Sequence, residues 1–160
     1  MGMITAEGVM SEEQVYRSYS QELVRYATGL VGPSDAPDVV TEACLKAFAS
    51  RTWPDVADRR AYLYRAVLSV ARDHHRQTLS RRAREMRAAE PERTLDRVGE
   101  MDVDVLEAVA RLSVRQRAAV YLTYWEDLAP GDVAARMGVS EGSVKRHLAR
   151  ARSRLGELLS

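Results

Sequence analysis

The chain has 160 residues, with 24 basic and 23 acidic side chains and a formal charge of +1. This length fits one ordinary domain or two very small ones, and it excludes a long multi-domain enzyme. Its single cysteine excludes an internal disulfide framework, and no apolar stretch approaches the roughly 18–20 residues of a membrane span. We therefore expect a cytoplasmic protein with no membrane partner.

The near-neutral total conceals a charge pattern along the chain. Residues 1–45 carry 2 basic and 7 acidic side chains, and residues 46–84 carry 10 and 3. Residues 85–110 carry 3 and 8, and residues 111–160 carry 9 and 5. The four blocks therefore have charges of −5, +7, −5 and +4. Two basic blocks indicate two surfaces for a polyanion, although charge alone also fits an ordinary solvated surface.

The apolar periodicity is helical, and three helices are predicted in the N-terminal half. A capping box formed by Ser11 and Gln14 starts the first helix. Pro37 suits the first turn of a second helix, which runs to about residue 50. Asp58 is a good N-cap for a third helix, which continues to about residue 79.

An acidic stretch separates the two halves of the chain. It contains a proline and a glycine and has little apolar content, which is typical of an interdomain linker. We predict an all-α fold with two small helical domains joined by a flexible linker. The predicted parts are a tail over residues 1–10, a first domain over 11–84, the linker over 85–104 and a second domain over 105–160.

The second domain contains a predicted helix-turn-helix over residues 132–150, after a second capping box at Ser113. Ala134 is small where two helices approach each other, Gly138 tolerates the positive φ of the turn, and Ser140 is a suitable N-cap. An ordinary helical hairpin within a core is the alternative, but the joint match favours DNA binding. The outward side chains of the second helix are types that meet phosphates and base edges: Ser143, Lys145, Arg146 and Arg150.

Longer stretches carry a family resemblance. The sequence LSVRQRAAVYLTYWEDLAPGDVAARMGVSEGSVKRHLARARSRL resembles region 4 of bacterial extracytoplasmic-function (ECF) sigma factors, and it is also similar to the DNA-binding domains of LuxR-type regulators. DAPDVVTEACLKAF, followed by RAYLYRAVLSVARDHHRQ, is similar to region 2 of the same sigma factors. The resemblance implies a factor without a cofactor or an active site. Such a factor binds core RNA polymerase, recognises the minus-10 and minus-35 promoter elements and directs transcription initiation of a specific regulon.

The resemblance also implies roles for individual residues. Those that would dock on the clamp helices of the largest polymerase subunit are Asp38, Val39, Glu42, Leu45 and Lys46, with plain core as an equal alternative for Val39. Those that would capture the single-stranded minus-10 element are Trp53, Arg59, Arg60, Tyr62, Tyr64, Arg65, Ser69, Arg72 and Arg76. The helix-turn-helix would read the minus-35 element through Lys145, Arg146 and Arg150, with Ser143 beside them. Further expected partners are the flap of the second-largest subunit and an anti-sigma factor, and the free chain is expected to be a monomer.

Some positions depart from the family pattern. Ser69 stands where the family usually carries Asn, Tyr62 replaces a usual tryptophan, and Thr123 replaces a frequent arginine. The usual Ser-Tyr-Glu-Glu start of the helix-turn-helix is Ala129-Pro130-Gly131-Asp132, so we expect a slightly frayed start there.

Three other functions are alternatives to a sigma factor. The first is a stand-alone helix-turn-helix regulator that binds duplex DNA without polymerase. The second is a metal-dependent enzyme built on His74, His75, Asp73 and Cys44, but adjacent histidines on a helix point about 100° apart and cannot easily share one metal. The third is a decoy that holds an anti-sigma factor, which would not need the basic face of the last helix.

Overall fold

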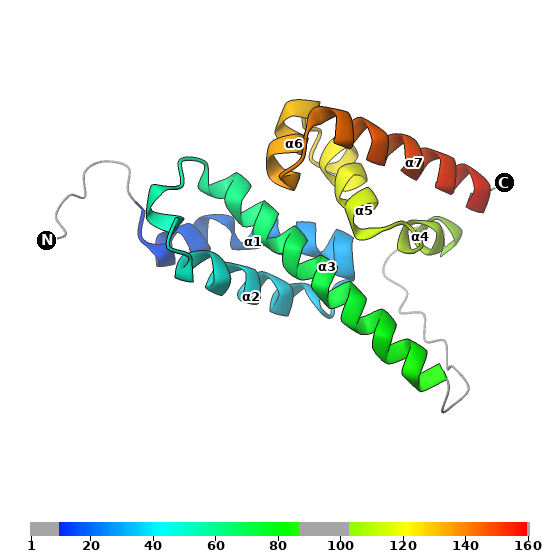
Figure 1. Cartoon of the computed structure of the whole chain (residues 1–160), viewed down its shortest axis with the longest axis horizontal. Helices are drawn as coiled ribbons and strands as arrows, with labels where there is room; N and C mark the ends of the chain where they lie inside the picture. Colours follow the sequence, from blue (N-terminus) through cyan, green and yellow to red (C-terminus); the bar gives the residue numbers. More distant parts are fainter. Residues whose placement is uncertain (1–9, 87–102, 160) are drawn as a thin grey trace, which may run out of the picture.

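A computed structural model describes residues 10–86 and 103–159, and all regular structure in these ranges is helical (Figure 1). The N-terminal bundle contains α1 (Glu12–Val31), α2 (Ala36–Ala49), the 3-10 turn η1 (Trp53–Asp55) and α3 (Arg59–Met86). The C-terminal bundle contains α4 (Val103–Ala110), α5 (Val114–Val120), the π-helical segment η2 (Tyr121–Trp125), α6 (Pro130–Met137) and α7 (Glu141–Leu159). The prediction of an all-α fold is confirmed. Most of the predicted linker and of the tail lies outside the described residues.

The predicted helix starts are confirmed by their caps. The Ser11 hydroxyl accepts a hydrogen bond from the Gln14 N–H at 3.2 Å, and the Gln14 side chain accepts one from the Ser11 N–H at 2.8 Å. The box at Ser113 has the same two bonds. Asp58 accepts the Ala61 N–H at 3.0 Å at the start of α3. Each cap satisfies a donor that the first turn leaves free.

α3 differs from its predicted bounds, and the helix after Ser113 departs from α-helical geometry in its last part. α3 passes residue 79 and ends at Met86, two residues into the predicted linker, because the segment 80–86 contains no Gly or Pro and is rich in good helix formers. The helix that starts at Ser113 becomes π-helical at Tyr121. The Leu128 N–H then bonds to the Leu122 carbonyl at 3.1 Å, which completes the turn into α6.

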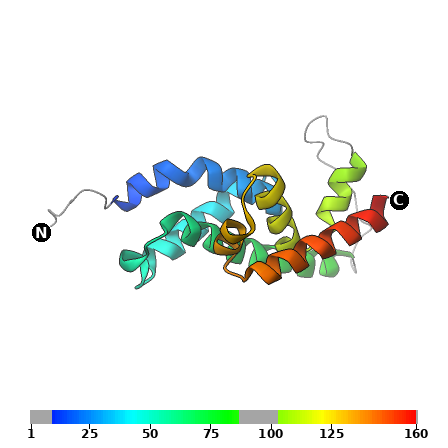
Figure 2. The same cartoon turned by 90° about the horizontal axis from the view of Figure 1, so that it is seen from above.

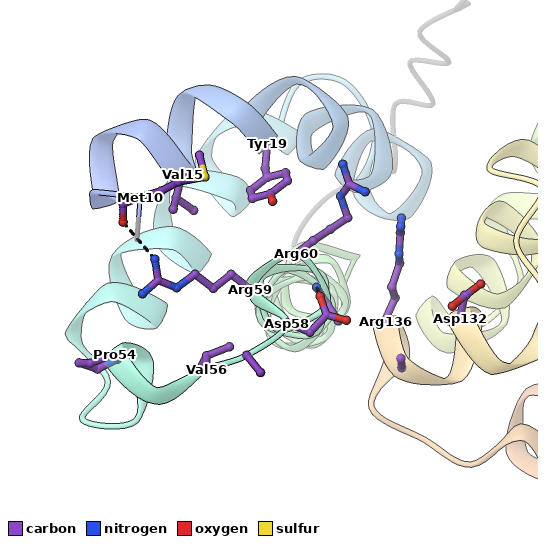
Figure 3. A pocket seen from close by; sticks show the side chains of 13 residues that line it. Met10, Val15, Tyr19, Pro54, Val56, Asp58, Arg59, Arg60, Asp132 and Arg136 are labelled. Carbon is purple, nitrogen blue, oxygen red and sulfur yellow. Dashed lines mark hydrogen bonds between the residues drawn. The ribbon is translucent and has the colours of Figure 1, made fainter. Parts of the chain in front are cut away.

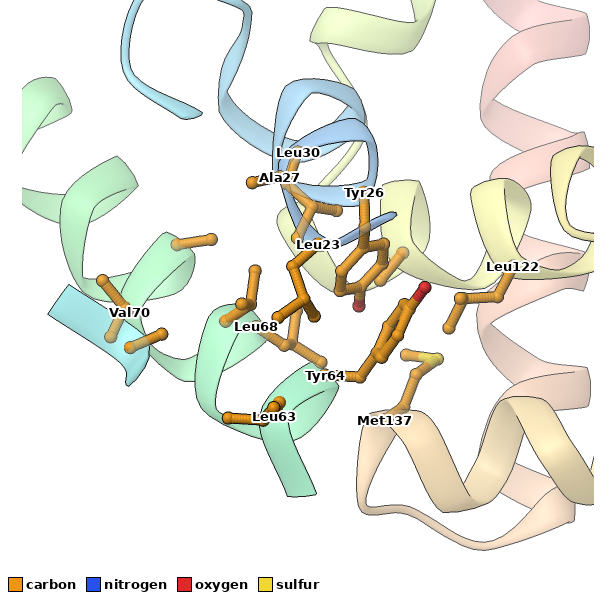
Figure 4. Packing of buried hydrophobic residues seen from close by; sticks show 14 of the residues in the cluster. Leu23, Tyr26, Ala27, Leu30, Leu63, Tyr64, Leu68, Val70, Leu122 and Met137 are labelled. Atoms are coloured by element: carbon orange, nitrogen blue, oxygen red, sulfur yellow. The ribbon is translucent and has the colours of Figure 1, made fainter. Parts of the chain in front are cut away.

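One apolar core runs through both bundles (Figure 4). In the N-terminal bundle, Leu23 and Leu63 are fully buried between α1 and α3. The rings of Tyr26 and Tyr64 lie 4.8 Å apart. On the other side of this pair, the C-terminal bundle contributes buried side chains that include Met137 of α6. The two helical domains therefore share a packed interface.

Polar contacts also join the two bundles, which lie side by side in both views (Figures 1 and 2). Arg117 of α5 donates through Nη1 to the Leu30 carbonyl at the end of α1, at 2.7 Å. Arg65 of α3 donates through Nη1 to the Ala135 carbonyl of α6, at 2.9 Å. These bonds join residues that are 87 and 70 positions apart in the chain. The interface is thus fixed at two separate points.

Candidate nucleic-acid interface

The helix-turn-helix is built from local sequence signals. Gly138 ends α6 with φ 69° and ψ 35°, in the left-handed region that glycine adopts without strain. The Ser140 hydroxyl accepts the Ser143 N–H at 3.1 Å and so caps α7. α6 begins at Pro130 after Ala129, which makes no side-chain cap bond, so a frayed first turn stays a prediction. The turn therefore orients α7 as the sequence predicts.

α7 presents a cationic face to solvent. Its inner side, with Val144 and Ala151, is completely buried, whereas Lys145, Arg146 and Arg150 are exposed. None of these three cations forms an ion pair in the part of the chain described here. Arg146 donates instead to the half-buried Ser143 hydroxyl at 2.9 Å. Three cations on one helix face can therefore meet phosphates and base edges.

A shallow groove of about 290 Å³ lies on the surface shared by α2 and α3. Tyr62, Arg65 and Ser69 line it from α3, and Lys46 lines it from the end of α2. Ser69 is exposed, and the Arg65 guanidinium lies 5.7 Å from the centre of the Tyr62 ring. A groove with two cations and an aromatic ring suits a single nucleic-acid strand, whose phosphates and bases need those two kinds of group.

The segment before α3 is anchored by aromatic packing. Trp53 is only 4% exposed, and its ring meets Phe48 and Tyr62 edge-on. Arg59 lies over the Trp53 ring at 4.9 Å and donates to the Met10 carbonyl at 3.0 Å. Trp53 therefore packs in the core under this segment, and the half-buried Arg59 is the more accessible of the two side chains.

A cavity of about 530 Å³ opens between the start of α3 and α6 (Figure 3). Arg60 contributes from α3, and Asp132 and Arg136 contribute from α6. Arg60 also pairs with Glu22 at 3.2 Å and lies over the Tyr19 ring at 5.1 Å. The predicted minus-10 residue Arg60 thus faces the other bundle across this cavity.

Tyr64 and Arg65 lie at the interface of the bundles. Tyr64 is part of the core and has no exposed surface, and the Arg136 guanidinium lies over its ring at 4.6 Å. Its hydroxyl donates to Glu22 at 2.8 Å, and burial together with that carboxylate raises the pKa of Tyr64. Arg65 bonds to α6, as described above. Two predicted minus-10 residues are therefore engaged with, or covered by, the C-terminal bundle.

Further along α3, the cations form a cluster across the interface. Arg76 is exposed and pairs with Asp73 of its own helix. Burial and the nearby charges of Arg115 and Arg76 lower the pKa of Arg72. Because Arg115 belongs to α5, the structure brings cations of both basic sequence blocks together.

The predicted polymerase-docking residues divide into two groups. Asp38, Glu42, Leu45 and Lys46 line a shallow apolar depression of about 400 Å³ on α2, and Leu45 is 65% exposed there. Glu42 and Lys46 pair at 3.0 Å. Val39 is only 3% exposed and packs in the core. Val39 therefore occupies the core, which is one of the two alternatives for this residue.

The candidate metal ligands His74, His75, Asp73 and Cys44 do not come together in one cluster among the described residues. Within residues 10–86 and 103–159, no group of three or more His, Cys, Asp or Glu side chains could hold an ion. Cys44 is buried, which raises the pKa of its thiol to about 11 and makes it a poor nucleophile. The helices of the described ranges include none that is long and apolar enough to span a bilayer.

Comparisons with known proteins decide the family. Residues 15–82 match Sigma-70 region 2, and residues 102–155 match Sigma-70, region 4. The RNA polymerase sigma-E factor of Streptomyces antibioticus is 31% identical over 159 residues, which covers 94% of this chain and 86% of the relative. The ECF RNA polymerase sigma factor SigM of Mycobacterium tuberculosis is 31% identical over 151 residues, which covers 92% and 76%. The chain belongs to the ECF sigma factor family.

As a sigma factor, the chain binds core RNA polymerase and promoter DNA and directs transcription initiation, and it is not an enzyme. The region 2 match favours this function over a stand-alone LuxR-like regulator. The sigma factor RpoE of Bartonella quintana, solved with the anti-sigma factor NepR, superposes with a TM-score of 0.62 at 25% identity and covers 92% of this chain and 95% of its own. CnrH, solved with the cytosolic domain of CnrY, has the same fold with a TM-score of 0.52 at 23% identity.

Two arginines at the interface were not found from the sequence. Arg136 stacks on Tyr64 and Arg117 bonds to the end of α1, yet each lies in an ordinary helical pattern. No local signal marks them, because both partners belong to the other sequence half. Arg117 also has two guanidinium nitrogens, Nε and Nη2, that are buried without a hydrogen-bond partner among the described residues.

Proposed function

We propose that the outward face of α7 reads the minus-35 element in the major groove. The observation that carries this assignment is the exposure of Lys145, Arg146 and Arg150 on the second helix of a helix-turn-helix. Arginine and lysine bond to guanine edges and to phosphates, and a helix fits the major groove. Ser143 supports Arg146 through the 2.9 Å bond between them.

For the minus-10 element, the proposed surface lies on α3 and on the segment before it. We call the exposed and half-buried part the minus-10 face; it consists of Arg59, Arg60, Tyr62, Arg65, Ser69, Arg72 and Arg76. The groove beside Ser69 would hold the unstacked strand, while Arg72 and Arg76 would contact phosphates. Trp53 supports this face from the core, and Tyr64 lies beneath α6.

The proposed polymerase surface is the depression on α2. Asp38, Glu42, Leu45 and Lys46 combine an exposed leucine with both signs of charge, which suits a protein partner. The clamp helices of the largest subunit would dock there, and the C-terminal bundle would contact the flap of the second-largest subunit. The proposed boundaries are 11–84 and 105–160 for the two domains, with the tail over 1–10 and the linker over 85–104.

The partners of the chain also support proposals for its localisation and its regulation. Core polymerase works on chromosomal DNA, so we place the chain in the cytoplasm, as a monomer when free. The Bartonella relative was solved with an anti-sigma factor, and we include a protein of that kind among the proposed partners.

The deciding experiment is run-off transcription with core polymerase and genomic promoters. Arg146→Glu and Lys145→Glu are each expected to lower promoter-specific transcript by about fivefold or more, since one lost base contact is worth about 1–3 kcal/mol. Arg17→Glu, a charge reversal on exposed α1, is the matched control and should leave the transcript unchanged. Equal transcript from all three variants would refute the assignment of α7.

A further inference from the structure

Among the three exposed cations of the α7 face, Arg146 is distinguished by a side-chain hydrogen bond. Its Nη2 donates to the Ser143 hydroxyl at 2.9 Å. The guanidinium folds back over the first turn of α7, since Nη1 would lie 4.0 Å from a Cβ atom built at Gly142. No such bond holds Lys145 or Arg150 in the part of the chain described here. The direction of the Arg146 side chain is therefore set within α7 itself.

The Ser143 hydroxyl is in turn held by the cap of α7. It accepts a hydrogen bond from the Ser140 hydroxyl at 3.2 Å, and the Ser143 N–H donates to the same Ser140 oxygen at 3.1 Å. Ser143 is half-buried. A chain of hydrogen bonds thus runs from the turn before α7 to the Arg146 guanidinium.

The acidic residue at the start of α7 lies away from this guanidinium. The Glu141 carboxylate packs beside Gly131 of α6, where a built Cβ atom would lie 3.1 Å from Glu141 Oε1. Among the described residues, Glu141 forms no ion pair with Arg146 or Lys145. A guanidinium has five N–H donors, and the bond to Ser143 uses one of them. Arg146 therefore keeps its charge and several donors for a ligand.

We propose that Ser143 is a positioning residue, which directs the Arg146 guanidinium to a guanine of the minus-35 element. This inference rests on the proposed function of α7. In the major groove only guanine presents two acceptors, N7 and O6, and arginine binds both at once. Such a paired contact needs the guanidinium in one orientation. A side chain that is held in advance loses less rotamer freedom when it binds.

The place of Arg146 in α7 agrees with this role. In helix-turn-helix proteins, the residues at the N-terminal end of the second helix contact the base edges. Arg146 is the sixth residue of α7, and its guanidinium points back towards that end of the helix. Ser143 would then contribute to base specificity without touching a base.

The test uses the full chain with core polymerase and a promoter library randomised over the minus-35 element. Sequenced run-off transcripts give the base preference at each position. The wild type should prefer guanine at a position where Arg146→Ala lowers the preference about fivefold or more. Ser143→Ala should lower the preference at that same position about twofold to tenfold, with the other positions unchanged. The cap of α7 is kept in this variant, because the backbone N–H of residue 143 still donates to Ser140.

Three further variants separate positioning from a structural role. Ser143→Thr keeps the hydroxyl and should keep the guanine preference. Ser153→Ala is the matched control, because Ser153 is an exposed serine of the same helix, and it should change nothing. Ser143→Ala combined with Arg146→Ala should lose no more preference than Arg146→Ala alone, since the hydroxyl acts through that arginine.

Several results would overturn the inference. Relaxed preference at a different position in Ser143→Ala would show that the hydroxyl reads a base directly. An equal loss at all positions would show that Ser143 only stabilises α7, and an unchanged preference would show that its bond to Arg146 has no effect. An equal loss in Ser143→Thr and Ser143→Ala would exclude a role for the hydroxyl.

The same experiment distinguishes a failure of the proposed function. If the wild type shows a minus-35 preference that no substitution of Lys145, Arg146 or Arg150 alters, the assignment of α7 is wrong and the inference fails with it. If Arg146→Ala changes the preference and Ser143→Ala does not, the assignment of α7 stands and only the role of Ser143 is wrong.

Discussion

On α7, the cations Lys145, Arg146 and Arg150 stand in solvent without an ion pair among the described residues. On α3, by contrast, Arg65 is bonded to a carbonyl of the other bundle and Arg60 is paired with Glu22. Both helices come from basic sequence blocks, yet two of the candidate contacts on α3 are already engaged by other groups of the protein. Net positive charge along the sequence therefore marks a candidate nucleic-acid helix, while tertiary contacts decide whether that helix is ready to bind.

The turn at Gly138 is the position where a single substitution is expected to reduce the stability most. Gly138→Ala places a Cβ in the left-handed region, which costs about 1–2 kcal/mol, and it also collides with Arg65 Cδ at 2.7 Å. Chemical denaturation should show a loss of about 2 kcal/mol or more, with weaker contact between the bundles. Gly142→Ala, a helical glycine of α7 with only ordinary contacts at 3.8–4.0 Å, should be neutral or stabilising. Equal stability of the two variants would contradict the described turn.

Two neighbouring tyrosines at the centre of the interface differ in the hydrogen bonding of their hydroxyls. The Tyr26 hydroxyl is buried without a hydrogen-bond partner among the described residues, whereas the Tyr64 hydroxyl donates to Glu22 at 2.8 Å. Tyr26→Phe should therefore raise the free energy of unfolding by about 1 kcal/mol, and Tyr64→Phe should lower it by about 1 kcal/mol. Urea titrations of both variants check the opposite signs. A loss of stability for Tyr26→Phe would show that its hydroxyl has a partner.

What the sequence predicted well depends on local signals. The caps at Ser11, Asp58 and Ser140 and the turn at Gly138 each involve residues only a few positions apart, and all of them are found in the structure. The helix-turn-helix and its exposed basic face followed from these signals. The sequence could also place the cations of α3 on one helix, because helical periodicity fixes which side chains share a face.

What the sequence could not predict depends on packing between distant segments. Trp53 and Tyr64 are aromatic residues in a basic block, so strand stacking was a reasonable role for both, yet both are buried. Val39 lies one helical turn from exposed residues of the proposed polymerase surface but faces the core. The bond from Arg65 to Ala135 spans 70 residues, and nothing near either residue encodes it. The burial of aromatic and apolar side chains thus depends on tertiary packing that the neighbouring sequence does not encode.

The groove between α2 and α3, proposed to hold the minus-10 strand, offers a smaller test at Ser69. Ser69 is exposed in the groove, clear of the contacts that engage Arg65, and its side chain is shorter than the asparagine usual in the family. Ser69→Asn adds a donor and an acceptor that reach further into the groove, so it should tighten minus-10 strand binding by a few-fold, about one hydrogen bond. Fluorescence anisotropy measures the change, with Ser80→Asn, an exposed position further along α3, as control. Equal effects of the two substitutions would place Ser69 outside the strand path.

The smallest expected effect concerns two histidines whose neutral forms the fold favours. Burial and the charges of Arg117, Arg82 and His74 lower the pKa of His75, and burial and the charges of Arg115, Arg150 and Arg146 lower that of His147. A group whose pKa is lower in the folded chain binds protons more readily when unfolded. Its stabilising contribution is therefore complete above the ordinary histidine pKa of about 6.5 and declines as the pH falls through and below that value.

Thermal melts at pH 7.5 and pH 5.5 measure this decline, since both values lie above the ordinary range of carboxyl groups. The wild-type Tm should be lower at pH 5.5, by less than either tyrosine substitution changes it. His75→Gln should reduce the pH dependence, because glutamine stays neutral beside Arg117, and His147→Gln should reduce it beside Arg115. The radius of gyration at pH 5.5, measured by small-angle X-ray scattering, separates two causes. If His75→Gln keeps the chain more compact than the wild type at this pH, protonation of His75 weakens the contact between the two bundles. If His75→Gln raises the Tm without changing the radius, protonation of His75 acts on the stability of the N-terminal bundle.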